Sequence, residues 1–498
     1  MRVSAARAGS RLGGALVGAL ALLALLAGGA RAADSVYWAD FTKGRIFHAS
    51  LAGGPATEVP FPNAGKVGIG GVAVDPAAGK IYWTEFNPAA IMVANLDGSG
   101  ARPLNTAGSG LDSPLGITID TSAGQVYWAN RPLGGEGEAV SSSISFANVD
   151  GSGGGAVDTA GASLEFVQGV TVHPAAGRLY WADTGANKLS FANLAGGGGI
   201  LDIDPDAISG PIGVAIDAAS QRIFWANVGV DDTIGVAQLN GSGGTKLTPA
   251  GIEDPVGVAL DTAANRLYWA QATSPAIKFA NPFDGSAVGD VATGLDPEGQ
   301  PIFPVLLKAP LNLKPPSATG KATPGGTLTC AGAAWAPDAP EARLYRAAQT
   351  TALQWLRNGQ PIPGATAATL SAQQVGTYAC QSVATNFAGA TTATSAQLEV
   401  KASLKLKRAK LNKKNGTATL TLSVDTAGAI VLGGKGVRKA KKLAGRAGTY
   451  KLTIRATGKS KRKLLASGRA KVKAQVAFTP LGGKALKQTK SIVLRDLP

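Results

Sequence analysis

The sequence predicts an all-β protein made of three domains. Three observations support this: an aromatic phrase recurs through the first part of the chain, two cysteines flank a tryptophan in the middle, and apolar and polar residues alternate in a basic last part. A chain of 498 residues has room for about three domains. With 67 Gly and 28 Pro but no Gly-X-Y period, the composition excludes collagen and is typical of a loop-rich globular chain.

Charge is distributed very unevenly along the chain. The formal net charge is +16, yet residues 33–310 carry 13 Lys and Arg against 27 Asp and Glu, a net charge of −14. Residues 401–498 carry 26 Lys and Arg against only Asp425 and Asp496, a net charge of +24. The sequence therefore predicts an acidic body with a basic end.

Residues 1–32 are predicted to be a secretory signal peptide. Three arginines precede an apolar run over residues 12–27, and Ala30-Arg31-Ala32 has the small residues of a cleavage site. The apolar run is shorter than the roughly 20 residues of a membrane span, although an uncleaved anchor is the alternative. We expect a mature chain that begins near Ala33, has no transmembrane segment and works outside the cell or on its surface.

Residues 33–309 repeat one phrase six times. Its tryptophans are spaced 45, 45, 53, 44 and 44 residues apart, which is the length of one four-stranded propeller blade. In all repeats but the first, a short β-branched strand such as Val72-Ala73-Val74 and a polar turn precede the phrase. The phrases are Tyr37-Trp38-Ala39-Asp40, Tyr82-Trp83-Thr84-Glu85, Tyr127-Trp128-Ala129-Asn130, Tyr180-Trp181-Ala182-Asp183, Phe224-Trp225-Ala226-Asn227 and Tyr268-Trp269-Ala270-Gln271.

The first repeat lacks a preceding strand, which predicts how the ring closes. Residues 302–306 resemble an inner strand, but no aromatic strand follows them. We expect this segment to provide the inner strand of the blade that Tyr37 begins, because pairing it there removes an exposed sheet edge. The prediction is a six-bladed β-propeller.

The repeated phrase resembles the YWTD repeats of low-density lipoprotein receptor class B propellers. The likeness also includes Gly-Val-Ala-Val-Asp before the phrase and Asn-Leu-Asp-Gly-Ser-Gly after it. That family usually has Asp at the fourth position of the phrase, whereas this chain has Glu85, Asn130, Asn227 and Gln271 in four repeats. The family's Cys-rich neighbouring domains are absent, so receptor-type ligands are not expected.

Residues 310–400 resemble an immunoglobulin-like domain. Cys330 and Cys380 lie 50 residues apart, Trp355 lies midway between them, and Tyr378 precedes the second cysteine by two residues. The resemblance implies a disulfide that joins two sheets, packing of the tryptophan on that bond, and a corner hydrogen bond from the tyrosine. A redox-active pair is the alternative, but export favours a structural bridge.

Residues 401–498 are predicted to form a small basic β-sandwich. Period-two alternation marks strands such as 417–424, and basic segments such as Lys439–Lys442 and Lys459–Lys463 are expected to be loops. This stretch has only two aromatic residues, so specific nucleic-acid binding by base stacking is not expected. The charge favours contact with an anionic envelope polymer, a solubilising surface, or docking on the chain's own acidic propeller.

The sequence offers little for catalysis, for a metal or for a cofactor. Its two histidines, His48 and His173, occupy positions where other repeats have unrelated residues. Asp202, Asp204 and Asp206 alternate as calcium ligands can, but the rest of a calcium loop is missing. The inner strands contain no charged side chain, which disfavours the channel metal site of gluconolactonase-like propeller enzymes, although Gln168 or Gln300 could project inward. We predict no cofactor and leave a channel metal open.

The fourth positions of the six phrases form the candidate ligand-binding site. They end equivalent strands, so we expect a polar ring near one face of the propeller, which either contacts a ligand or satisfies backbone N–H groups between blades. The predicted function is that of an exported bacterial binding protein whose propeller face recognises a protein or glycan. A propeller enzyme and a purely structural envelope protein are the alternatives. The ring residues are Asp40, Glu85, Asn130, Asp183, Asn227 and Gln271.

Overall fold

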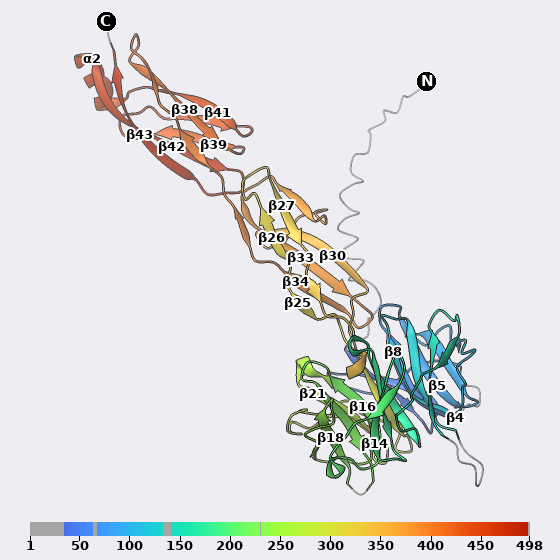
Figure 1. Cartoon of the computed structure of the whole chain (residues 1–498). Helices are drawn as coiled ribbons and strands as arrows, with labels where there is room; N and C mark the ends of the chain where they lie inside the picture. Colours follow the sequence, from blue (N-terminus) through green and yellow to red (C-terminus); the bar gives the residue numbers. More distant parts are fainter. Residues whose placement is uncertain (1–33, 63–66, 133–140, 230, 497–498) are drawn as a thin grey trace, which may run out of the picture.

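The computed structural model describes residues 34–62, 67–132, 141–229 and 231–496, and these form three bodies in a row (Figure 1). A β-propeller lies at one end, a β-sandwich with a disulfide lies in the middle, and a basic β-sandwich lies at the other end. The predicted signal peptide falls outside the described residues. The predicted fold class, an all-β chain with a propeller and two sandwiches, is confirmed.

The described part of the propeller contains six antiparallel sheets with four strands each from residues 35–307, which we call blades 1 to 6. The strands of each blade are given from the propeller axis outwards, which is also their chain order in blades 2 to 6. Blade 1 contains β24 (Pro301–Leu307), β1 (Ser35–Asp40), β2 (Arg45–Ser50) and β3 (Thr57–Glu58); blade 2 contains β4 (Val67–Asp75), β5 (Lys80–Asn87), β6 (Ala90–Asn95) and β7 (Arg102–Pro103); blade 3 contains β8 (Pro114–Asp120), β9 (Gln125–Asn130), β10 (Ser143–Asn148) and β11 (Gly154–Ala156).

Blades 4 to 6 repeat this order, with short 3₁₀ turns between some strands. Blade 4 contains β12 (Val167–His173), η1 (Pro174–Ala176), β13 (Arg178–Asp183), β14 (Lys188–Asn193) and β15 (Gly198–Ile200); η2 (Pro205–Ala207) precedes blade 5, which contains β16 (Pro211–Asp217), β17 (Arg222–Asn227), β18 (Thr233–Gln238) and β19 (Thr245–Leu247); blade 6 contains β20 (Pro255–Asp261), η3 (Thr262–Ala264), β21 (Arg266–Gln271), β22 (Ala276–Ala280) and β23 (Gly289–Asp290).

The ring closes as the sequence predicts. Strand β24 pairs antiparallel with β1, with Val305 opposite Tyr37 and Leu306 opposite Val36. The first and last parts of the propeller therefore share blade 1, and its inner edge is paired. The tryptophan of every repeated phrase is at most 1% exposed, so these side chains form the packing between blades.

The middle sandwich packs two main sheets around the predicted disulfide. Cys330 in one sheet bonds to Cys380 in the other, and Trp355 and Tyr378 are buried beside them. The Tyr378 hydroxyl donates to the carbonyl of Gln374 at 2.8 Å, which confirms the predicted corner bond. Its elements are β25 (Asn312–Lys314), β26 (Ser317–Gly320), β27 (Gly326–Ala331), β28 (Ala334–Trp335), η4 (Pro340–Ala342), β29 (Leu344–Tyr345), β30 (Thr350–Arg357), β31 (Gln360–Pro361), β32 (Thr369–Ala372), β33 (Gly376–Thr385), β34 (Ala390–Thr394) and β35 (Leu398–Val400).

The basic sandwich contains two four-stranded sheets with an apolar core. Alternate residues of its longest strand, β42, point inward and are buried, as period two requires. Its elements are β36 (Leu404–Leu406), β37 (Lys410–Asn412), β38 (Thr417–Val424), β39 (Gly428–Gly433), β40 (Ala440–Ala444), β41 (Gly448–Ile454), α2 (Gly458–Ser467), β42 (Arg469–Pro480) and β43 (Leu486–Arg495). Within the described ranges, no helix is long and apolar enough to span a membrane.

Two sequence predictions about this domain are wrong. The segment Lys459–Lys463 lies in helix α2 and is not a loop, because good helix formers surround a buried Leu464. Gly468, at φ 62°, ends the helix. Most of Lys439–Lys442 lies in β40, which pairs with β39 at the sheet edge. Lysines on an edge strand discourage pairing with other chains, so a charged run is compatible with a strand there.

Candidate functional site

The six residues of the predicted polar ring do lie at equivalent places on one face. Each follows the buried tryptophan of its blade by two residues; five of them end the second strand, and Glu85 lies two residues before the end of β5. None of the six is more than 4% exposed, so the ring lies beneath the surface and not on it. A ligand on this face would contact other side chains first.

Internal hydrogen bonds occupy the ring. Four of its side-chain oxygens accept from the indole Nε1 of the tryptophan two residues earlier, at 3.1 Å for Glu85, 2.9 Å for Asn130, 2.8 Å for Asn227 and 3.2 Å for Gln271. A buried indole N–H needs such a partner, so these contacts stabilise the blades.

The two aspartates of the ring bind backbone N–H groups instead. Asp183 accepts from the N–H groups of Glu165 and Phe166, both at 2.8 Å, and Asp40 accepts from the N–H of Gln300 at 3.1 Å. Each contact ties the ring to the approach of an inner strand. The contacts favour the structural interpretation, and a ligand-binding role for the ring stays a prediction.

The centre of the propeller is closed by glycines and one phenylalanine. A glycine precedes the apolar part of five inner strands, where the strand has a bulge against its neighbour. A Cβ at Gly169 would lie 2.7 Å from the Cα of Gly213, so the inner strands approach too closely for any side chain. The glycines are Gly71, Gly116, Gly169, Gly213 and Gly257.

Blade 1 has Phe303 at the equivalent position. Its ring carbon Cε1 lies 2.8 Å from the Cβ position of Gly169, and Cδ1 lies 2.7 Å from that of Gly257. The side chain is 3% exposed, so it fills the axis that the glycines surround. The side chain of Phe303 thus fills the space at the axis where the five glycines have no side chain.

A segment of the middle sandwich fills the channel from the other face. Residues 338–347, the channel segment, lie between β28 and β30 and include η4 and β29. They enter on the face opposite the polar ring, where the inner strands end, because Thr121, just after β8, donates to Asp338 at 3.0 Å. Turn η4 contacts the inner strands of blades 3, 4, 5 and 6.

Arg343 is the centre of this segment. Its guanidinium donates to backbone carbonyls of three blades: Nε to Pro304 at 3.0 Å, Nη1 to Ile117 at 3.3 Å, and Nη2 to Val72 at 3.2 Å and Phe303 at 3.3 Å. These carbonyls belong to the free inner edges of the strands, which need donors once they are buried. Burial lowers the pKa of Arg343 to about 10, so the side chain is still charged at neutral pH.

Strand β29 adds the backbone contacts. It pairs in parallel with β24, as a fifth strand of blade 1 inside the channel, with Leu344 beside Leu306. The Tyr345 hydroxyl donates to the carbonyl of Ile119 in blade 3 at 3.4 Å, and Thr171 of blade 4 donates to the carbonyl of Pro340 at 3.0 Å. The channel segment therefore bonds to inner strands on both sides of the axis.

The filled axis bears on the enzyme alternative. That alternative needs carboxylate and amide side chains around a central metal, but the axis holds Phe303, Arg343 and Tyr345. Gln168 donates instead to Thr184 at 3.0 Å. In the part of the chain that the structure describes, no three His, Cys, Asp or Glu side chains are grouped to hold a metal ion.

The remaining titratable candidates have local roles. His48 stacks on Tyr37 with ring centroids 5.1 Å apart, and burial lowers its pKa. His173 is buried at the end of β12 in blade 4. The residue at the equivalent position of blade 2, Asp75, accepts two backbone N–H bonds. Asp204 caps η2 by accepting from the N–H of Asp206 at 3.0 Å, so the acidic run forms a turn.

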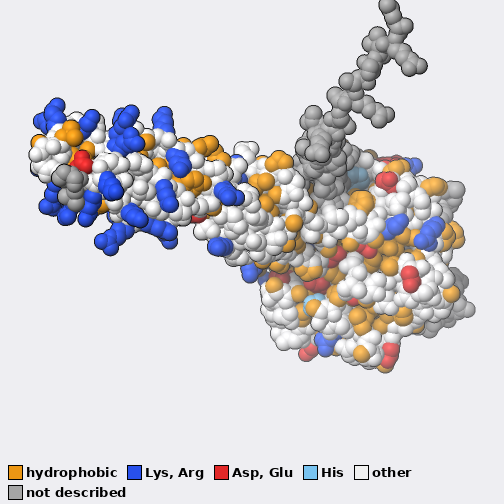
Figure 2. Space-filling view, turned by 90° about the horizontal axis from the view of Figure 1, so that it is seen from above, with side chains coloured by type: hydrophobic (Ala, Val, Ile, Leu, Met, Phe, Trp, Pro, Cys, Tyr) orange, Lys and Arg blue, Asp and Glu red, His pale blue; other side chains and the backbone are white. Residues whose placement is uncertain are grey.

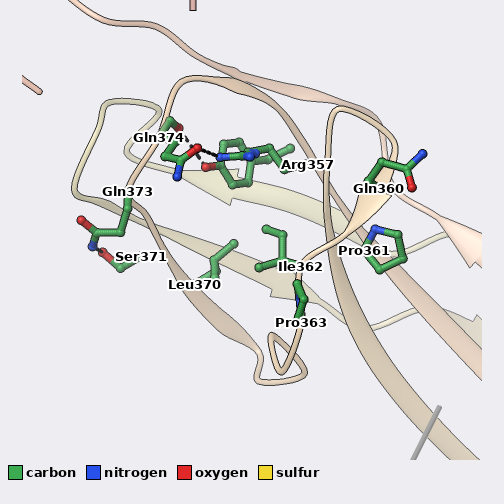
Figure 3. A pocket seen from close by; sticks show the side chains of 10 residues that line it. Arg357, Gln360, Pro361, Ile362, Pro363, Leu370, Ser371, Gln373 and Gln374 are labelled. Carbon is green, nitrogen blue, oxygen red and sulfur yellow. Dashed lines mark hydrogen bonds between the residues drawn. The ribbon is translucent and has the colours of Figure 1, made fainter. Parts of the chain in front are cut away.

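Two cavities outside the channel lack the features of a functional site. One of about 540 Å³ lies where blades 6 and 1 meet, but its cations are already paired, Lys43 with Asp296 at 3.0 Å and Arg45 with Glu58. The other, of about 300 Å³, lies in the middle sandwich, where Arg357 bonds to Gln374 (Figure 3). Its labelled side chains are mostly those of Gln, Pro, Ile and Leu, and none is placed for catalysis.

Sequence reasoning missed both elements that fill the channel, although signals existed. The glycine before each inner strand is visible in the repeats, and Phe303 replaces it once. Pro340-Glu-Ala-Arg-Leu-Tyr also resembles Pro174-Ala-Ala-Gly-Arg-Leu-Tyr of blade 4. Both segments form a 3₁₀ turn that ends in a left-handed residue, Arg343 at φ 54° and Gly177 at φ 61°.

Comparison with known proteins supports the repeat. Residues 79–121 match the family described as low-density lipoprotein receptor repeat class B. No curated protein matches the chain. Among solved structures, a chain of a nidogen/laminin complex is 19% identical, with a TM-score of 0.44, over 55% of this chain and 98% of that one. A TolB-like protein from Agrobacterium tumefaciens (9% identity, TM-score 0.38, 56% and 98% covered) and a gluconolactonase from Xanthomonas campestris (18%, 0.35, 48% and 84%) are also similar.

Proposed function

We propose that this is an exported binding protein with a head, a spacer and a basic end. The head is a six-bladed YWTD-type propeller whose free face, the one above the polar ring, recognises a protein or glycan. The spacer is an immunoglobulin-like domain. The basic sandwich contacts an anionic polymer of the cell envelope, so the protein works outside the cell or on its surface.

The observation that carries the proposal is the occupied channel. The chain's own Arg343 and Phe303 fill the axis, and the middle sandwich covers the face where the channel segment enters. The opposite face is the broad surface of the propeller that the described residues leave uncovered. Recognition on that face needs no channel chemistry, which is why binding is favoured over catalysis.

The charge of the basic sandwich supports the second contact. Its cations lie on more than one side of the domain (Figure 2), and both sheets place them outward, Lys451 on one and Lys471 and Lys473 on the other. Lys401 with Glu399 is the ion pair found in this region among the described residues. Unpaired cations hold counterions whose release favours polyanion binding. The domain lies at the far end from the propeller, so docking on the acidic head is not seen (Figure 1).

The test is binding of the full-length protein to isolated cell envelope across a salt series. Three variants are compared: wild type, a neutralised variant with Arg469→Gln, Lys471→Gln and Lys473→Gln, and a charge-preserving control with Arg469→Lys, Lys471→Arg and Lys473→Arg. We expect salt to weaken wild-type binding and the neutralised variant to bind less well and with a flatter salt dependence, while the control matches wild type.

Other outcomes would contradict parts of the proposal. Equal binding by all three variants at every salt concentration would remove the basic end as the envelope contact. Envelope retention that depends on the basic end, together with no saturable protein or glycan partner for the head, would favour the structural alternative. Turnover of a sugar lactone by the full-length protein would favour the enzyme alternative.

A further inference from the structure

Three aromatic side chains and one arginine form a row on the free face of the propeller. Phe41, Phe86 and Arg131 each follow a residue of the polar ring, in blades 1, 2 and 3, and Phe166 precedes the inner strand of blade 4. We call these four residues the aromatic–arginine row. Phe41, Phe86 and Arg131 are half-buried and Phe166 is exposed, so all four lie nearer the surface than the buried ring does.

The row is continuous. The rings of Phe41 and Phe86 meet edge to face, with centroids 5.7 Å apart and planes at 69°. The Arg131 Cζ lies 5.5 Å from the centroid of Phe86 and 4.4 Å from that of Phe166, so the guanidinium is held between two phenyl rings. Such cation–π contacts fix a guanidinium in position without using its N–H groups as hydrogen-bond donors.

Arg131 has no anionic partner among the described residues. No carboxylate oxygen of the described chain lies within 4.0 Å of its side chain, and its Nε is buried without a hydrogen-bond acceptor. Other propeller cations are paired, such as Lys278 with Asp290 at 2.7 Å and Lys43 with Asp296 at 3.0 Å. A fixed, unpaired guanidinium is a site for a carboxylate, because charge-assisted hydrogen bonds to carboxylates are strong.

We propose that the aromatic–arginine row binds an extended protein segment that places one carboxylate side chain on Arg131 and an apolar or aromatic side chain beside Phe86 or Phe166. This inference rests on the proposed function of the free face and names its partner chemistry. A single acidic residue matches the single cation of the row. A polyanionic glycan is disfavoured because residues 33–310 carry a net charge of −14, which repels repeated negative charge.

The test selects ligands without assuming one. A random peptide library displayed on phage is selected on the full-length protein, and the same library is selected on full-length Arg131→Gln. We expect wild type alone to enrich peptides that share an Asp or Glu near an apolar residue. Synthetic copies of these peptides should bind Arg131→Gln about 10- to 100-fold more weakly in calorimetry, as expected for loss of a hydrogen-bonded charge.

Two further variants control the result. Arg222→Gln is the matched control, because Arg222 also lies over aromatic rings, Phe224 and Phe283, but starts β17 at the opposite end of its blade, and it should bind like wild type. Phe166→Ala tests the row without removing the charge. Phe166 is 37% exposed, so this variant should fold normally and bind more weakly.

The outcomes separate this inference from the proposed function. Enriched peptides that bind wild type and Arg131→Gln equally, or that lack acidic residues, would overturn the row and leave the free face as a binding surface. An anionic oligosaccharide such as oligogalacturonate that binds in an Arg131-dependent way, with no enriched peptide, would overturn the peptide in favour of a glycan. Failure of the envelope test would leave the peptide result unaffected.

Discussion

Replacing Arg343 by methionine tests whether the channel segment stabilises the propeller. Methionine has similar length and leaves the left-handed backbone at φ 54° with the same steric cost, so the change removes mainly the guanidinium. Four backbone carbonyls of blades 1, 2 and 3 lose their donor inside a closed core. The segment itself should stay in place, because β29 still pairs with β24.

The magnitude follows from two opposing terms. Each hydrogen bond from a charged donor contributes about 1.5–3 kcal/mol net, so four contacts of 3.0–3.3 Å set an upper limit of roughly 6–12 kcal/mol. Holding a guanidinium that is 3% exposed costs several kcal/mol of desolvation, and methionine removes that cost. The expected loss of unfolding free energy is about 3–5 kcal/mol, which lowers the Tm by roughly 6–20 °C.

Scanning calorimetry of the full-length protein is the assay, with Arg357→Met as the control. Arg357 lies in the same sandwich but outside the channel, where it bonds to Gln374 (Figure 3), so its loss should move the Tm by no more than about 2 °C. Arg343→Met should lower the transition that contains the propeller. A transition that stays within about 2 °C of wild type would refute the view that Arg343 holds the blades together.

Four further predictions follow from the same structure. Asn227→Ala should lower the Tm of the propeller by an amount that corresponds to about 2–4 kcal/mol, because Asn227 bonds to Trp225, Ser209, Ala207 and Thr233; an unchanged Tm with lost ligand binding would instead make the polar ring a binding site. Stability should fall between about pH 10 and pH 12, because burial raises the pKa of Tyr37, Tyr82 and Tyr127 to about 12 and the unfolded chain therefore loses these phenol protons first. The pKa of Arg343, lowered to about 10, changes stability in the opposite direction, but it is one group against three. Unfolding followed by phenolate absorbance measures the net effect. Replacing both Cys330 and Cys380 by alanine should destabilise the middle sandwich by about 4 kcal/mol, measured by urea unfolding, because the bond closes a loop of 50 residues. N-terminal sequencing of protein recovered outside the cell should begin near Ala33, and a chain that retains Met1 would contradict the cleaved signal peptide.

Much of the fold was predictable, because each repeat contains the local sequence pattern of one blade. A tryptophan every 44 to 53 residues and a strand before each phrase predict the blades, and the lone segment at 302–306 predicts the closure. The cysteine, tryptophan and tyrosine spacing resembles that of an immunoglobulin-like domain, and this resemblance implied the disulfide and the corner bond that the middle sandwich has. In each of these cases a local pattern and the tertiary structure require the same residue.

The candidate site was predictable only in part. The six ring residues lie near one face as predicted, but their burial depends on how closely neighbouring blades approach, which one repeat does not specify. The channel segment depends on contacts between residues about 40 to 270 positions apart, from Phe303 or Val72 to Arg343. The row at Arg131 was not predicted, because Phe41, Phe86 and Phe166 lie in different repeats and become neighbours only when consecutive blades pack side by side.

The channel segment also sets the direction of the head. It enters the propeller where the inner strands end, on the face opposite the polar ring, and it belongs to the sandwich that leads to the basic end. If the basic sandwich contacts an envelope polymer, the aromatic–arginine row therefore points away from that contact. Arg343 then has two effects: it donates to the backbone carbonyls that face the propeller axis, and it ties the head to the middle sandwich so that the free face is presented outward. Arg343→Met should bind the selected peptides as wild type does in solution, because Arg131 lies on the other face.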